Sequence, residues 1–172
     1  MAHILTFQSV KPDIDETAFI ADTATIIGRA KLHEGVSIWF NAVLRGDENQ
    51  ITVGKYTNIQ DNVMVHPDAD QPLTIGNYVL IGHNAIIHGA SIGDGCLIGM
   101  GSIIQSYTDI GENCIIGAGS LVTQHKKIPA NSLVYGNPAR VIRTLSQEEI
   151  DHVRHNVMGY YELSREYKAA QQ

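Results

Sequence analysis

The chain has 172 residues, a formal net charge of −6 and a pI of about 5.7. This length suffices for one domain with a core, and the acidic balance argues against a nucleic-acid-binding surface. No apolar stretch reaches 18 residues, the N-terminus lacks a signal-peptide pattern, and two cysteines are too few for a disulfide framework. We therefore expect a cytoplasmic protein with reduced thiols and with no nucleic-acid or membrane partner.

A six-residue hydrophobic repeat occupies most of the chain. A glycine often follows the aliphatic anchor of each unit, and the residue four positions after the anchor is usually small. The anchor and the small residue have the same strand parity, so both can point inward. The anchors are Ile14, Ile20, Ile26, Leu32, Ile38, Leu44, Val53, Ile59, Val65, Ile75, Ile81, Ile87, Ile92, Ile98, Ile104, Ile110, Ile116, Val122, Ile128 and Val134.

Six residues form one short strand and one turn, so three units close a coil of 18 residues, and coils stack through parallel ladders. The repeat therefore predicts an all-β solenoid, a parallel β-helix of about seven coils, over residues 1–145 including a short N-terminal lead-in. Cys96 and Cys114 are 18 residues apart at the same repeat position. We expect them to stack inside the core as small hydrophobic residues.

The repeat loses its phase in three places, and each place lies beside polar residues. The step between anchors is nine residues over 44–53, ten over 65–75 and five over 87–92. The first break contains the sequence RGDE, the second follows His66 and the third contains His88. Breaks of this kind in an otherwise regular solenoid predict a functional site.

Three of the eight histidines, His66, His83 and His88, lie near one predicted turn in the region of the breaks. Three histidine ligands that leave a fourth position open are typical of a catalytic zinc site. Their spacing is equally consistent with histidines that cap turns or form hydrogen bonds between coils. A separation of five residues places His83 and His88 on different faces of a regular strand or helix, so a site that uses both requires a bend or a second chain.

Residues 146–172 predict a C-terminal helix. Ser146 and Glu149 match a capping box, in which each residue satisfies a backbone N–H at the start of the helix. An apolar stripe follows, and we expect it to pack on the solenoid or on a neighbouring subunit. The stripe consists of Ile150, Val153, Val157 and either Tyr160 or Tyr161.

The motifs LRGDEN, TNIQDNVMVH, IGHNAIIHG and YGNPARVIR, spread over Leu44 to Arg143, resemble those of the γ-class carbonic anhydrase family. The resemblance implies a left-handed β-helix and a homotrimer with a metal at each subunit interface, either zinc or, alternatively, iron or cobalt. His66 and His88 would bind one metal, and His83 would bind the metal of the adjacent interface. The implied reaction is reversible hydration of CO₂ to bicarbonate by a metal-bound hydroxide, because the metal lowers the pKa of its water to roughly 7.

The resemblance also implies roles for residues around the metal. Gln60 would form a hydrogen bond with the metal-bound water, and Asn58 and Asp61 belong to the motif beside it. Tyr160 would be an active-site tyrosine from the helix, with Tyr161 as the alternative.

Three charged residues complete the implied site. Arg45 and Asp47 would form an interfacial pair, with Arg45 also assisting bicarbonate binding, and Glu48 would take part in proton transfer. Active members of the family carry a longer acidic loop where this chain has only PDADQP at 67–72. The two aspartates of this segment offer a replacement, although a solvated turn is the simpler interpretation.

Three other functions remain open on the sequence. A hexapeptide acyltransferase needs a general-base histidine and a long cleft for its acyl donor, but no three-histidine site. A metal-dependent CoA thioesterase would use the same scaffold as the carbonic anhydrase. A non-catalytic trimer would retain the metal for stability alone.

Overall fold

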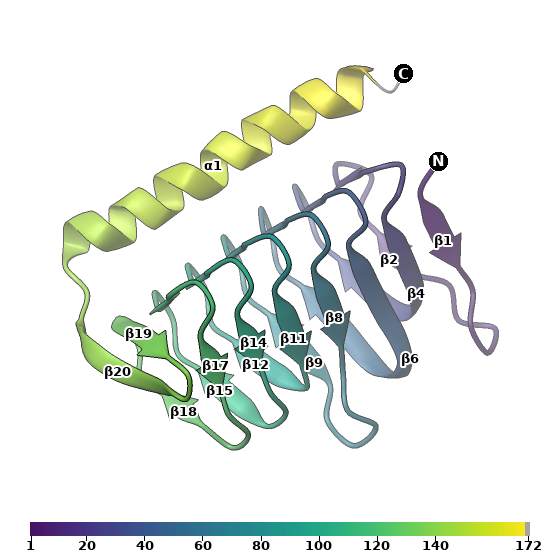
Figure 1. Cartoon of the computed structure of the whole chain (residues 1–172). Helices are drawn as coiled ribbons and strands as arrows, with labels where there is room; N and C mark the ends of the chain where they lie inside the picture. The colour runs from purple at the N-terminus through teal and green to yellow at the C-terminus, as the bar shows by residue number, and fades with distance from the viewer. Residues whose placement is uncertain (171–172) are drawn as a thin grey trace.

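The computed structural model describes residues 1–170, which form a left-handed parallel β-helix of about seven turns followed by one helix. The fold predicted from the repeat is therefore confirmed. Figure 1 shows helix α1 (Gln147–Ala170) lying along one side of the solenoid, from the last coil back to the first. The final residues of the predicted helical segment, 171–172, lie outside the described residues. Within 1–170, no helix combines the length and the apolar character that crossing a membrane requires.

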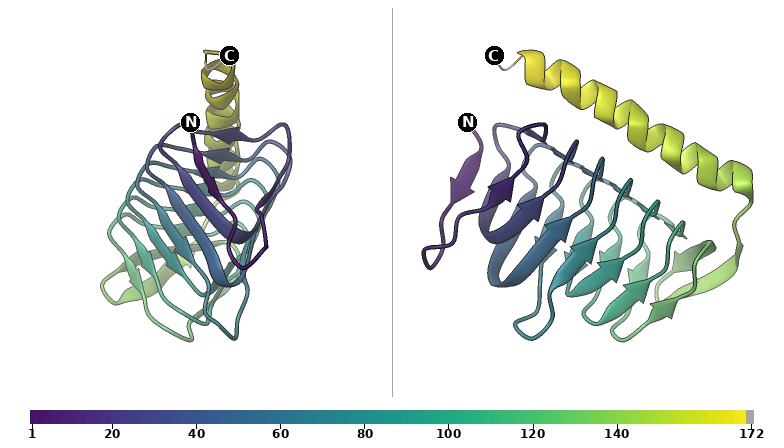
Figure 2. Two further views of the ribbon diagram at one scale, coloured as in Figure 1. Left: turned by 90° about the vertical axis from the view of Figure 1, so that its right-hand side faces the viewer. Right: turned by 180° about the vertical axis from the view of Figure 1, so that it is seen from behind.

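The strands form three ladders, one on each side of a prism (Figure 2). The strands β4 (Thr25–Leu32) and β6 (Val43–Val53) are long enough to turn a corner and take part in two of these ladders. Face one also contains β1 (His3–Leu5), β8 (Met64–His66), β11 (Ile86–His88), β14 (Ile103–Ile104) and β17 (Leu121–Val122).

The other two faces follow the same parallel pattern. Face two also contains β2 (Asp13–Ile14), β9 (Leu73–Ile75), β12 (Ala90–Ile92), β15 (Thr108–Ile110) and β18 (Lys127–Ile128). Face three contains β3 (Phe19–Ile20), β5 (Ser37–Ile38), β7 (Asn58–Ile59), β10 (Leu80–Ile81), β13 (Leu97–Ile98), β16 (Ile115–Ile116), β19 (Ser132–Gly136) and β20 (Ala139–Thr144). The antiparallel pairing of β20 with β19 ends the parallel ladder of face three.

The repeat anchors fill the interior of the prism. Ile87 of β11 pairs with Val65 on one side and Ile104 on the other, and all three are fully buried. Burying one such side chain stabilises the fold by about 1.5–3 kcal/mol, so the column of anchors supplies the main driving force. Cys96 and Cys114 stack as predicted: both are buried, and the backbone N–H of Cys114 donates to Cys96 Sγ at 3.4 Å.

The C-terminal helix begins with the predicted capping box. The backbone N–H of Glu149 donates to Ser146 Oγ at 3.3 Å, and that of Ser146 donates to Glu149 Oε2 at 2.9 Å. Arg143 adds a bidentate pair with the Glu149 carboxylate, which, with the Ser146 backbone, lowers the pKa of Glu149 to about 2. Val153 and Val157 are buried, and α1 contacts β3, β5 and β7, so the apolar stripe packs on face three.

Candidate metal centre

The three breaks in the repeat meet at one corner of the prism, between face one and face two. Strand β6 passes through this corner, the segment 67–72 leaves it after β8, and Gly89 turns it between β11 and β12. Gly89 has a φ of +52°, and a Cβ there would clash with Asp68 Oδ2. A glycine therefore allows both the tight turn and the approach of the Asp68 carboxylate.

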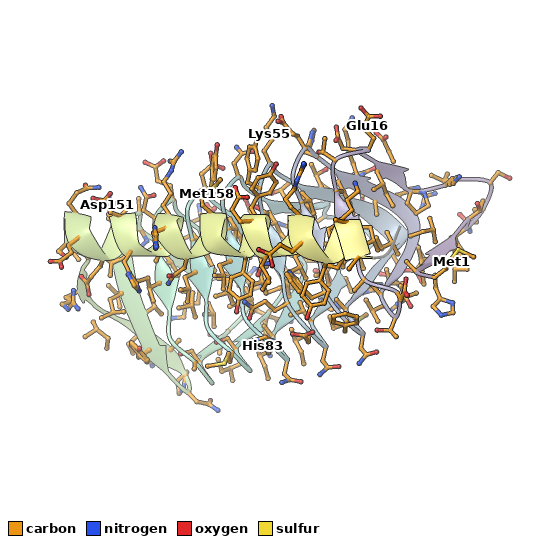
Figure 3. The ribbon with its side chains drawn as sticks, turned by 90° about the horizontal axis from the view of Figure 1, so that it is seen from above. Met1, Glu16, Lys55, His83, Asp151 and Met158 are labelled. Carbon is orange, nitrogen blue, oxygen red and sulfur yellow. The ribbon has the colours of Figure 1, made fainter. Side chains whose placement is uncertain are left out.

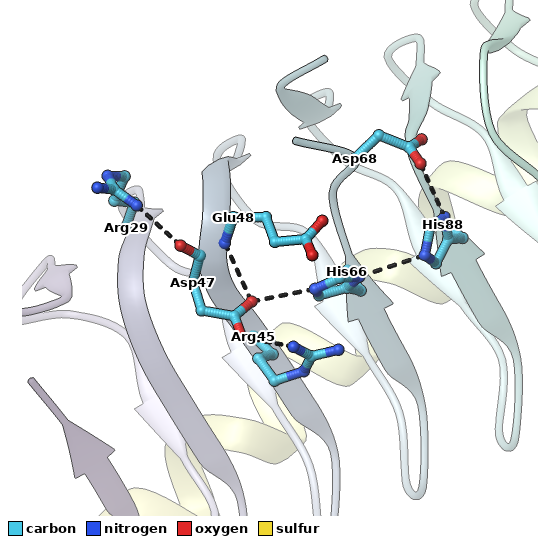
Figure 4. Close-up of polar contacts among 7 residues, drawn as sticks. All are labelled: Arg29, Arg45, Asp47, Glu48, His66, Asp68 and His88. Atoms are coloured by element: carbon cyan, nitrogen blue, oxygen red, sulfur yellow. Dashed lines mark hydrogen bonds and ion pairs between the residues drawn. The ribbon is translucent and has the colours of Figure 1, made fainter. Parts of the chain in front are cut away.

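His66 and His88 face each other at this corner, because they are direct partners in the ladder between β8 and β11 (Figure 4). His66 Nδ1 lies 3.2 Å from His88 Nε2. The His66 side chain is only 7% exposed, whereas that of His88 is 43% exposed and reaches solvent. The pair thus presents two imidazole nitrogens to the same point at the edge of the solenoid.

The other ring nitrogen of His66 is held by an acidic partner. His66 Nε2 lies 3.0 Å from Asp47 Oδ1, and Arg45 Nη1 donates to Asp47 Oδ2. Burial alone would raise the pKa of Asp47, but the hydrogen bonds from Arg45 and His66 outweigh it and lower that pKa below its usual value. Asp47 is thus a carboxylate that fixes the orientation of the His66 ring.

His88 has a corresponding support on the opposite side. His88 Nδ1 lies 3.0 Å from Ser106 Oγ and 3.6 Å from Asp68 Oδ1, and Ser106 Oγ donates to Asp68 Oδ1 at 3.2 Å. Tyr107 OH donates to Asp70 Oδ1 at 2.9 Å, which ties segment 67–72 to the second coil after its own. This segment is therefore an anchored loop with one aspartate at the histidine pair, and the expectation of a freely solvated turn is wrong for Asp68.

The histidine pair fits two ligands of a tetrahedral metal. Zinc–nitrogen bonds of about 2.0–2.1 Å place two ligand nitrogens about 3.3–3.4 Å apart. The observed separation of 3.2 Å between His66 and His88 is close to this value. Ligand histidines usually have their second nitrogen bound to a carboxylate or another oxygen, and both rings satisfy that condition here.

His83 lies at a different corner, between face three and face one, at the opposite end of β11 from His88. Its Nδ1 is 2.7 Å from Asp61 Oδ2, and its backbone N–H donates to Gln60 Oε1 at 3.2 Å. Within residues 1–170, no three histidine, cysteine or acidic side chains come together as a metal-binding group. The structure thus groups His66 with His88, and it groups His83 with Gln60 and Asp61.

The remaining polar candidates divide between these two corners. Asn58 is buried on the outer side of face three, where α1 packs, and its Nδ2 donates to Ser37 Oγ at 2.8 Å. Glu48 is exposed beside Asp47, and Figure 4 shows its side chain extending in the direction of His66.

The two helix tyrosines have different surroundings. Tyr160 packs edge-on against Trp39, with ring centroids 5.9 Å apart, and it lines a groove together with Gln60 and His83. Tyr161 packs edge-on against Tyr56, with ring centroids 5.1 Å apart, and does not line that groove. Tyr160 is therefore the tyrosine placed near the candidate site residues.

The sequence did not single out Ser106. Its signal is the coil length, because Ser106 follows His88 by 18 residues and so occupies the next coil directly beside it. From the sequence, Asp68 is only a candidate replacement for the missing loop acid. Its contact with Ser106 depends on the path of segment 67–72, which lies outside the repeat.

The fold and the histidine-lined corner define a hexapeptide-repeat β-helix protein. Residues 72–106 and 89–124 match the family described as "Bacterial transferase hexapeptide (six repeats)". A carbonic anhydrase from Geobacillus kaustophilus is 45% identical over 98% of this chain and 93% of its own. A "Probable carbonic anhydrase" from Methanocaldococcus jannaschii is 50% identical over 88% of this chain and 95% of its own. The chain belongs to the γ-class carbonic anhydrase family.

A solved structure shows how closely the whole fold is matched. A Bacillus cereus protein, named provisionally as an acetyltransferase, superposes with a TM-score of 0.97 at 43% identity. The match covers 98% of each chain. The same fold thus carries two functional names among close relatives, so the functional assignment depends on the site.

Proposed function

We propose that this protein is a homotrimeric, metal-dependent carbonic anhydrase that catalyses reversible hydration of CO₂ to bicarbonate. The observation that carries the proposal is the pair of facing nitrogens of His66 and His88. Each ring is oriented by its own partners, which leaves these two nitrogens available for a metal. The naming of two close relatives as carbonic anhydrases gives independent support.

In this proposal, His83 from a neighbouring subunit completes the metal site. A column of apolar side chains on face one supports this arrangement, because it runs between the corner of the histidine pair and the corner of His83. Ile86 is 41% exposed and Ile103 is 38% exposed, which is unfavourable for a free surface. Packing face one against a second copy buries the column and brings the corner of His83 in one copy to the corner of His66 and His88 in the other. A ring of three subunits repeats this contact and leaves no unpaired surface. The column consists of Val43, Met64, Ile86, Ile103 and Leu121.

Three imidazole ligands suit Zn²⁺, with Fe²⁺ or Co²⁺ as alternatives. When bound, the metal supplies a Lewis acid that lowers the pKa of water to about 7 and thereby provides the nucleophile for CO₂. Asp47 holds the outer nitrogen of His66 and Asp61 that of His83, which fixes both rings in one tautomer.

The other residues of the site bind the substrate and move the proton. Gln60 and Tyr160 line the space beside His83, where they orient water and exclude competing positions for CO₂. Arg45 supplies a positive charge that favours bicarbonate. Glu48 is exposed beside the centre. It accepts the proton that CO₂ hydration releases and passes this proton to solvent.

The test combines metal analysis with rapid kinetics on protein purified without oxygen. Metal content near one per subunit and stopped-flow hydration of CO₂ are expected, and His88→Ala should lose both. His33→Ala is the matched control, because His33 lies at the turn between β4 and β5, at the corner of faces two and three, and should leave both unchanged. The protein should be produced in separate media supplied with zinc, iron or cobalt. Wild-type protein that holds less than about 0.1 metal per subunit in all three media would refute the proposal.

The acetyltransferase name of the Bacillus cereus relative supports an acyltransferase as the second candidate. An assay that measures acyl transfer from acyl-CoA to an amine or hydroxyl acceptor separates this activity from CO₂ hydration. Hydrolysis of the acyl-CoA without an acceptor would indicate the thioesterase instead. A fully metallated trimer that is inactive in all three assays would indicate the non-catalytic role.

A further inference from the structure

A groove of about 540 Å³ runs between α1 and the solenoid. It begins beside Gln60 and His83, passes over β13 and β16, and ends beside Tyr135. Figure 3, seen from above the helix, places His83 on one side of α1 and Lys55 on the other. The groove includes His83 among its lining residues, so it reaches the side of the helix that carries this candidate residue.

The walls of the groove are largely apolar. Leu97 and Ile115 project from face three on neighbouring coils, and Leu163 lies across from them on α1. Met100 is 57% exposed and Leu163 is 39% exposed, although both line the groove. Large apolar side chains exposed in a concave surface are typical of a ligand-binding groove.

The polar groups of the groove favour a ligand with an oxygen-rich end that accepts hydrogen bonds. No aspartate, glutamate, lysine or arginine among residues 1–170 lines the groove, and the carboxylate of Asp61 is already paired with His83 Nδ1 at 2.7 Å. Gln60 is only 3% exposed, and its Oε1 accepts the His83 backbone N–H. No hydrogen bond from its Nε2 is found among residues 1–170, so an amide donor is available where Gln60 lines this end of the groove.

The size of the groove does not match CO₂ alone. Volumes of about 300–1,000 Å³ with apolar walls and a few polar groups are typical of sites for organic ligands of moderate size. We propose that the groove binds an aliphatic carboxylate, with its head at Gln60 and His83 and its hydrocarbon chain along Leu97, Ile115 and Leu163. The inference rests on the proposed function only in placing the head group of the ligand beside the candidate metal centre. Binding of the ligand's hydrocarbon tail requires no metal.

The test is calorimetric titration of octanoate into the purified protein, with and without metal. Octylamine, with the same chain and the opposite charge, is the probe for the head group. Octanoate is expected to bind in both metal states and octylamine at least tenfold more weakly. The readout is independent of hydratase activity.

Two variants locate the binding site. Ala118→Phe places an aromatic ring in the wall of the groove and should weaken octanoate binding at least tenfold. Ala130→Phe makes the same change at another exposed solenoid turn that does not line the groove, and it should bind as the wild type does. Leu163→Asn, on the helix wall, gives a second loss-of-binding variant should Ala118→Phe alter the fold.

Two results overturn the inference: no octanoate binding to the wild type, or equal affinity in the two groove variants and the control. Equal or stronger binding of octylamine overturns the assignment of a carboxylate. A protein that hydrates CO₂ but binds no octanoate refutes this inference alone. A protein that binds octanoate in the groove but neither holds metal nor hydrates CO₂ refutes the proposed function alone.

Discussion

His66 Nδ1 lies 3.2 Å from His88 Nε2, although the two residues are 22 positions apart in the sequence. The relationship follows from the β-helix, because a parallel ladder places equivalent residues of successive coils side by side. The 22-residue step exceeds the 18 residues of a regular coil because segment 67–72 is added at the corner. The insertion therefore leaves the histidines in register and adds Asp68 beside them.

Asp68→Asn should weaken metal binding by about 10–100-fold, because supports of ligand histidines commonly have effects of this size. The substitution replaces the carboxylate that accepts the Ser106 hydroxyl by a neutral amide. It thereby weakens the support that Ser106 gives to His88 Nδ1. Competition with a chelator of known affinity measures the change. Asp70→Asn is the matched control: it lies in the same segment but contacts Tyr107 instead, and an equal loss in both variants would contradict a specific role for Asp68.

Gly89→Ala should both destabilise the fold and weaken metal binding. A non-glycine residue at a φ of +52° costs about 1–2 kcal/mol, and the new Cβ displaces the Asp68 carboxylate. Thermal unfolding measures the first effect and chelator competition the second. Gly101→Ala provides the control, because its φ is +66° but its Cβ would meet no atom within 4 Å. It should lose similar stability without losing metal affinity.

Ile86→Asp should dissociate the proposed trimer by placing a carboxylate in the apolar column of face one. The charge would have to be buried at the subunit contact without a partner, which strongly disfavours association. Light scattering coupled to size exclusion reports the mass. Ile142→Asp, an equally drastic change at an exposed isoleucine on β20, should leave the mass unchanged. A trimer that survives the Ile86 substitution would place the contact elsewhere.

The helix cap should make a pH-dependent contribution to stability. The pKa of Glu149 falls from 4.5 to about 2 in the folded chain, chiefly through Arg143. A depressed folded-state pKa stabilises the fold fully above the unfolded value of 4.5, and the stabilisation is lost as the pH falls through about 2. The difference in melting temperature between wild type and Glu149→Gln should therefore be constant from pH 7 to about 5 and shrink below 4.5. A difference that grows as the pH falls would contradict this assignment.

The sequence contained most of the information needed for the fold, because the six-residue repeat specifies both the strand length and the inward positions. Ile87 and Ile104 could be placed in one column from their spacing alone, and the structure pairs them directly. The capping box of Ser146 and Glu149 was equally predictable, because it depends on residues only three apart.

The site was less predictable than the fold. Spacing placed His66, His83 and His88 near one turn, but the structure separates His83 because the four residues after β10 turn a different corner. The anchors Ile75, Ile81 and Ile87 keep the regular step of six residues, so counting repeat units rather than coil spacing does place His83 one corner before His88. The support of His88 by Asp68 was inaccessible from the sequence, because segment 67–72 follows no repeat and its path depends on contacts such as that of Tyr107.

The sharing of a metal between subunits can be tested by complementation. His83→Ala and His88→Ala trimers should each hold little metal, because every interface in either trimer lacks a ligand. In trimers formed by mixing the two chains equally, an interface is complete when His83 comes from one variant and His66 with His88 from the other. Random assembly makes about a quarter of the interfaces complete in a heterologous ring.

The decisive measurement is the metal content of such mixed trimers after joint unfolding and reassembly. The shared site predicts recovery to about a quarter of the wild-type content. Trimers of the double variant His83→Ala/His88→Ala alone, treated in the same way, should show no recovery. Mixed trimers that hold no more metal than their separate parents would contradict a site built from two chains.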